Sequence, residues 1–150
     1  MGASHDTGRS IDPQLVEYLV VVVPDERSVH PVLDAFEVLA SRRQIAVLDA
    51  AVVTHDLAGS VAVTELPASR RPSLLATPLG VLSEHDLKLV AQAIQPGDLA
   101  IVVVVEDDWA RPLAEAVRAV GGQVAGGERI PPARLQAVFP TLQTSRRDAS

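Results

Sequence analysis

The amino-acid sequence predicts an α/β (α+β) domain with a ferredoxin-like βαββαβ sandwich core and an appended α-β-α segment. Two short runs, 18–23 and 99–105, are rich in valine, as strands buried on both faces are. A segment with apolar residues at helical spacing follows the first run, and another precedes the second. Between the two helical segments, a glycine-containing loop joins two more strand-like runs. This order of elements is that of a split βαβ fold.

The first half of the chain contains three predicted strands and one helix. After the strand 18–23, apolar residues recur at the i, i+3, i+4, i+7 spacing of one helical face, which predicts a helix over about 28–41. Pro31 fits there because the first turn of a helix contains N–H groups without intrahelical partners. The runs 45–54 and 61–66 flank a loop that contains glycine, and they predict a β-hairpin.

A loop and a well-marked helix precede the second valine-rich run. The segment 67–82 contains three prolines and has no clear periodicity, so we expect it to cross the surface as a loop. Ser83 and Asp86 have the spacing of a capping box, which predicts that a helix begins there. The run Gln-Pro-Gly-Asp at 95–98 ends this helix before the strand 99–105.

The appended segment is predicted from weaker patterns. Apolar residues within 113–120 predict a third helix, which ends at Gly121. The run 123–130 is interpreted as an edge strand weakened by glycine, and 131–139 as a short closing helix that begins with proline.

Composition limits the possible classes of function. The chain has 150 residues, and we expect one domain over 15–140 between disordered tails at 1–14 and 141–150. Its formal net charge is −6, and its thirteen basic residues are scattered, which argues against a nucleic-acid partner. It has no cysteine, so disulfides, thiolate metal ligands and cysteine nucleophiles are excluded, and a reducing cytoplasm suits it.

Membrane insertion is not expected. Residues 1–13 lack the apolar region of a signal peptide. The longest apolar runs, 19–24 and 99–105, are much shorter than the roughly 20 residues of a membrane-spanning helix. The sequence therefore predicts a cytoplasmic protein.

No catalytic, cofactor or metal site is predicted. The chain contains neither a nucleophile elbow nor a glycine-rich phosphate loop, and no two of its four histidines are three or four residues apart. The acidic turns 25–26 and 106–108 could attract a hard cation. They follow strands that are antiparallel neighbours in the predicted sheet, so they should lie at opposite ends of it and cap helices instead.

Two groups of residues are candidates for binding. Arg70, Arg71 and His85 would lie near the mouth of a pocket under the loop 67–82, and they are candidate ligand-binding residues. Trp109 and Arg111 are candidate interface residues, because tryptophan and arginine are favoured at the centres of protein interfaces. The alternative is that Trp109, the single tryptophan, packs onto the core of its own domain.

Several segments carry a family resemblance: 18–23, 48–53, 80–86 and 95–103. Over about residues 15–140 the chain resembles a small actinobacterial domain family of unknown function. That family is related to glycine-rich proteins, described as membrane proteins, whose function is also unknown. The chain has an arginine- and proline-containing segment, 70–80, where those relatives carry a glycine-rich insert. The resemblance implies the fold and no catalytic residue.

The leading hypothesis is a non-enzymatic homo-oligomeric interaction or regulatory module, a homodimer by default, because closed symmetric pairs dominate oligomers. An unidentified protein partner is a further possibility. The alternative is a small-molecule sensor or enzyme with a pocket under the loop 67–82. A third hypothesis, peripheral membrane association, has little support, since the net charge is negative and no basic amphipathic helix is present.

Overall fold

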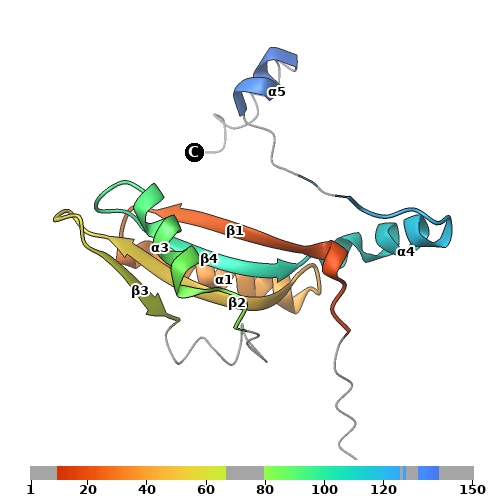
Figure 1. Cartoon of the computed structure of the whole chain (residues 1–150), viewed down its shortest axis with the longest axis horizontal. Helices are drawn as coiled ribbons and strands as arrows, with labels where there is room; N and C mark the ends of the chain where they lie inside the picture. Colours follow the sequence, from red (N-terminus) through yellow and green to blue (C-terminus); the bar gives the residue numbers. More distant parts are fainter. Residues whose placement is uncertain (1–9, 67–79, 126, 128–131, 139–150) are drawn as a thin grey trace, which may run out of the picture.

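The computed structural model describes residues 10–66, 80–125, 127 and 132–138 of the chain. Within these residues the fold is α+β, with a four-stranded antiparallel sheet in the order β1-β4-β2-β3 (Figure 1). The strands are β1 (Val16–Val23), β2 (Ala46–His55), β3 (Val61–Glu65) and β4 (Leu99–Glu106). The helices are α1 (Val29–Ser41), α3 (Glu84–Ala93), α4 (Arg111–Ala119) and α5 (Pro132–Val138), with 3-10 turns η1 (Pro13–Leu15), η2 (Glu26–Ser28) and η3 (Asp108–Ala110).

The sheet has two central and two edge strands. β4 pairs antiparallel with β1 on one side and with β2 on the other, and β3 pairs with β2 as a hairpin. The register places Val23 opposite Leu99 and Val16 opposite Glu106. The acidic turns that follow β1 and β4 therefore lie at opposite ends of the sheet, as predicted. Asp25 caps η2 by accepting a hydrogen bond from the N–H of Ser28 at 3.0 Å.

The two longest helices cover opposite faces of the sheet. The side chains of α1 and of one sheet face form a cluster that includes Leu33, Phe36, Ile101, Val103 and Val105. The side chains of α3 and of the other face form a second cluster, which includes Leu87, Ala91, Val53, Ala100 and Val102. Alternate residues of β4 thus point to different helices, and β4 is buried on both faces, as its continuous apolar run predicted.

The predicted βαββαβ order of the first six elements is confirmed, but the ferredoxin-like topology is not. α1 and α3 lie on opposite faces, whereas helices segregated to one face are typical of a two-layer α+β sandwich. The central strands are β2 and β4, and β1 lies at an edge. Periodicity along the chain gives the length and type of an element, and it does not say which face of the sheet a crossover helix will cover.

The prediction that β1 is buried on both faces is wrong. Its α3 side is exposed and its α1 side is only partly buried, because β1 is an edge strand and α3 packs over β2 and β3 instead. The edge strand expected over 123–130 is not formed by its described residues 123–125 and 127, and its other residues lie outside the described part. Most of the loop 67–82 also lies outside the described residues.

The helix boundaries follow local sequence signals. The hydroxyl of Ser83 accepts a hydrogen bond from the N–H of Asp86 at 3.1 Å, which is the predicted N-terminal cap of α3. Gly97, in the turn that leads into β4, has φ of 93°, and Gly121, which ends α4, has φ of 78°. Glycine reaches this left-handed region without steric cost, so both positions allow the chain to reverse.

Candidate interaction surface

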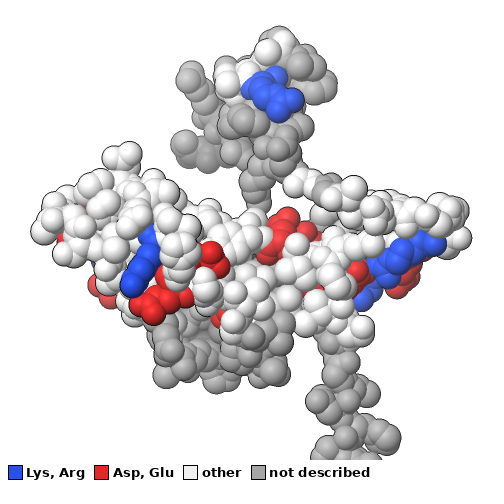
Figure 2. Space-filling model, in the orientation of Figure 1, with Lys and Arg blue, Asp and Glu red and all other residues white. Residues whose placement is uncertain are grey.

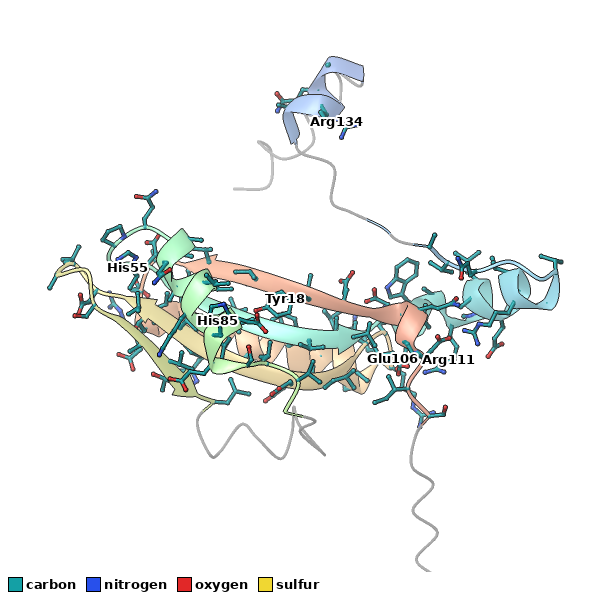
Figure 3. All side chains as sticks on the ribbon, in the orientation of Figure 1. Tyr18, His55, His85, Glu106, Arg111 and Arg134 are labelled. Carbon is teal, nitrogen blue, oxygen red and sulfur yellow. The ribbon has the colours of Figure 1, made fainter. Side chains whose placement is uncertain are left out.

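The structure describes one of the three predicted ligand-binding residues, His85. Arg70 and Arg71 lie outside the described residues, as does most of the loop under which the pocket was expected. His85 lies in the first turn of α3 with an exposed side chain (Figure 3). Among the residues that the structure describes, no group of three or more His, Asp or Glu side chains is arranged to hold a metal ion.

The two predicted interface residues have different surroundings. Trp109 lies in η3 and is 67% exposed, and its backbone N–H donates to the carbonyl of Gln44 at 3.1 Å. Arg111 begins α4 and turns toward the protein, where its guanidinium lies 3.0 Å from carboxylate oxygens of both Glu106 and Asp108. Trp109 is therefore presented to solvent, while Arg111 takes part in an internal ion-pair network.

This network joins the chain before β1 to the end of β4 and to α4. Glu106 is fully buried, and besides the ion pair with Arg111 it accepts a hydrogen bond from the backbone N–H of Asp12. Asp12, which the sequence analysis assigned to the N-terminal tail, is 9% exposed and accepts from the guanidinium of Arg118. A carboxylate buried at the end of a strand needs such partners, because removing a charge from water is costly.

Sequence reasoning missed the network because its members are far apart in the chain. Glu106 was interpreted as part of an acidic turn that caps a helix. One signal in the sequence could have indicated its burial. Glu106 directly follows the apolar run 99–105, so it can continue the same buried strand. The network fixes the start of α4 and the preceding turn, and so it positions Trp109 beside β1.

The exposed apolar residues of β1 form the main feature of the surface. Val16, Tyr18, Val20 and Val22, here named the β1 stripe, point to the α3 side of the sheet and are 37%, 44%, 42% and 51% exposed. Their cross-strand partners on β4 are at most 2% exposed. The contrast arises because α3 covers the sheet from β3 to β4 and stops short of β1.

In the described part of the chain, β1 is an edge strand of the sheet, and the β1 stripe carries the backbone groups of that edge. The carbonyl of Leu15 accepts from the N–H of Asp107 at 2.8 Å, and these two residues are opposite one another in the register of β1 and β4. Hydrogen-bonded pairs alternate along an antiparallel ladder, so the odd-numbered residues of β1 bond to β4. The N–H and C=O groups of the even-numbered residues, which are the β1 stripe, therefore point away from the sheet.

The side chain of Tyr18 extends from β1 toward α3 on this face (Figure 3). Partial burial, followed by the negative charge of Asp86 in the first turn of α3, raises the pKa of the Tyr18 hydroxyl. Both effects disfavour the phenolate, because it would be a second negative charge in a less hydrated place. The ring is thus held as a neutral, mainly apolar part of the stripe.

A groove of about 750 Å³ lies along the first half of β1. Residues from Gln14 to Leu19 line it, and so do Trp109, Leu113, Val124 and Gly127. The N–H of Val124 donates to the side-chain oxygen of Gln14 at 3.2 Å, which joins two of the lining segments. Few charged side chains are seen along β1 in Figure 2, and Glu17 is the only charged residue of the strand.

The chain matches no protein-family model, no curated protein and no solved structure. The resemblance to the actinobacterial family therefore stays a prediction. None of the helices in the described part has the length and apolar character required to cross a membrane.

Proposed function

We propose that the domain is a non-enzymatic, cytoplasmic module that assembles with a second copy of itself through β1, and that it acts in interaction or regulation as a homodimer. The observation that carries this proposal is the β1 stripe, in which apolar side chains and outward-pointing backbone groups occur on the same four residues. A partner strand could therefore form both apolar side-chain contacts and backbone hydrogen bonds with the same four residues.

An edge strand of this kind is normally protected in a protein that stays monomeric. Lysine, proline, a bulge or a short length are the common means, since an exposed apolar edge is a template for aggregation. β1 is eight residues long and has one charge, Glu17. The opposite edge strand, β3, has five residues and ends in Thr64 and Glu65. The need for a covering partner is therefore concentrated at β1.

The exposed area is of the size that a dimer uses. Side chains of this size expose roughly 150–250 Å² when fully accessible. At the exposed fractions of the β1 stripe, Trp109 and Leu113, these side chains leave about 600 Å² of mainly apolar surface per protomer. A standard interface buries about 800 Å² per partner, so the addition of the strand backbone brings the surface close to that size.

Light scattering during size-exclusion chromatography, or native mass spectrometry, tests the proposal on the full chain at micromolar concentration. We expect a dimer for the unmodified protein and a monomer for Val20→Lys, because the lysine would place a charge in the centre of the stripe. Val63→Lys is the matched control, since Val63 is 38% exposed on the other edge strand, and it should remain dimeric. A monomeric unmodified protein, or equal effects of both substitutions, would contradict the proposal.

A further inference from the structure

We infer that the two copies pair their β1 strands antiparallel about a two-fold axis at Leu19, so that Tyr18 lies opposite Val20 of the partner subunit. The two four-stranded sheets then form one continuous sheet of eight strands. This inference deepens the proposed function and rests on it. The proposed function names β1 as the interface, and the inference specifies which residue of the partner subunit lies opposite each residue of β1.

The orientation of the backbone groups limits the possible registers. Only the even-numbered residues of β1 direct N–H and C=O groups outward, as the bond between Leu15 and Asp107 shows. In a symmetric antiparallel pair, every hydrogen-bonded pair must therefore join two even-numbered residues. A two-fold axis at Leu19 meets this condition and gives all four residues of the β1 stripe a partner, with Val16 opposite Val22 of the partner subunit.

Registers shifted by two residues in either direction lose contacts at the ends of the strand. With the axis at Val20, Val16 would lie opposite Pro24 of the partner subunit, which has no N–H to donate. With the axis at Tyr18, Val22 would lie opposite Gln14 of the partner subunit, and Gln14 lies in η1 with its side chain bonded to Val124. The register centred on Leu19 is the one that uses the strand from end to end.

The side chains agree with this register. Glu17 lies opposite Val21 of the partner subunit, so the single charges of the two strands are not opposed. Like charges directly across a pair of strands are destabilising, and an axis near Glu17 would bring them together. The β1 stripes of the two protomers both lie on the α3 side of the eight-stranded sheet. They are adjacent across the two-fold axis and form one apolar surface.

The groove beside β1 fits the partner strand. Its lining includes the residues from Gln14 to Leu19, and in this register the first half of β1 faces the partner's residues 19–22, which are leucine and valine. The exposed ring of Trp109 lines the same groove and would pack on this segment. An apolar extended chain adding its backbone to a free edge is the mode of recognition called β-augmentation.

Single cysteines test the register directly, because the chain has no cysteine of its own. In the inferred register, Leu19 faces its own copy across a non-hydrogen-bonded pair, where the Cα atoms are about 4.5 Å apart and a disulfide can form. Val21→Cys is the matched control, because Val21 lies on the same face of β1 and is also partly buried. Its two copies would be about 13 Å apart along the strands, which is too far for a disulfide.

Under mild oxidation of the full-length proteins at equal concentration, we expect Leu19→Cys to form at least about tenfold more disulfide dimer than Val21→Cys. A mixture of Glu17→Cys with isotope-labelled Val21→Cys gives a second readout. It should yield the disulfide between residues 17 and 21 of different copies, identified by mass spectrometry of the digested product. This mixture decides the register even if Leu19→Cys folds poorly.

The outcomes separate this inference from the proposed function. A dimer by mass whose cross-links form at Val21 with itself, or at none of these positions, would overturn the register and leave the dimeric module standing. A monomeric unmodified protein would overturn both. Cross-links at Leu19 and between residues 17 and 21 would support both.

Discussion

Arg111, at the start of α4, places its guanidinium 3.0 Å from the carboxylate of Glu106, which is fully buried at the end of β4. The same guanidinium lies 3.0 Å from Asp108, so one cation serves two carboxylates. This contact links a helix that carries part of the groove to the central strand of the sheet. It makes the position of Trp109 depend on a buried charge pair.

Removing the cation should destabilise the fold. In Arg111→Met the buried carboxylate of Glu106 loses its ion pair with the guanidinium, and we expect the free energy of unfolding to fall by about 3 kcal/mol. Chemical denaturation measures this change. Arg27→Met is the control, because Arg27 is an exposed arginine of η2 and should change stability by less than about 0.5 kcal/mol. Equal stabilities of the two variants would show that the pair contributes nothing.

The ionisation of Tyr18 should require an unusually high pH. Tyr18 is the single tyrosine, so its phenolate absorbance can be followed without interference. Burial and the charge of Asp86 raise its pKa above the ordinary value of about 10. Asp86→Asn should move the titration midpoint down, while Glu84→Gln, in the same turn of α3, should leave it in place. A midpoint that is unchanged in Asp86→Asn would contradict this assignment.

The same shift predicts how stability depends on pH. Because the pKa of Tyr18 is higher in the folded protein than in the unfolded chain, the folded state holds its proton more tightly. Its contribution to stability is complete below the unfolded pKa near 10 and is lost as pH rises through the folded pKa. Tyr18→Phe should therefore show a smaller loss of stability above pH 10 than the unmodified protein, measured by denaturant titration at each pH.

Assembly should change the environment of Trp109. The single tryptophan is 67% exposed in one chain, and the proposed dimer would cover it with the partner strand. We expect its fluorescence emission to shift to longer wavelength on dilution, as the ring returns to water. Val20→Lys should show the long-wavelength emission at all concentrations. An emission maximum that does not depend on concentration, in a protein shown to dissociate, would place Trp109 outside the interface.

The cap of α3 should contribute measurably to stability. Ser83 accepts from the backbone N–H of Asp86 and donates to the Asp86 carboxylate at 2.7 Å, so Ser83→Ala removes both bonds. A loss of about 1 kcal/mol in the free energy of unfolding is expected. Ser83→Thr keeps the hydroxyl and should restore most of it. If the alanine and threonine variants unfold at the same denaturant concentration, the hydroxyl does not act as a cap.

Local chemistry explains which elements could be predicted. The capping box at Ser83, the left-handed glycines at 97 and 121, and the apolar periodicity of α1 are each decided within a few residues of sequence. For the same reason the hairpin of β2 and β3 was predicted near its observed limits. Of the candidate site, Trp109 is exposed and its interface role stays a prediction, while Arg70 and Arg71 lie outside the described residues.

The sequence by itself determined the kind and order of the elements, because hydrogen bonding within a helix or across a tight turn depends on neighbours along the chain. It also determined that β1 and β4 would both be strands, since both are continuous valine-rich runs. Only the tertiary structure decided that β4 lies at the centre and β1 at an edge, that Glu106 is buried against Arg111, and that α3 leaves the β1 stripe uncovered. Burial depends on what packs against a strand from distant parts of the chain, and two runs with nearly the same residues can have different neighbours.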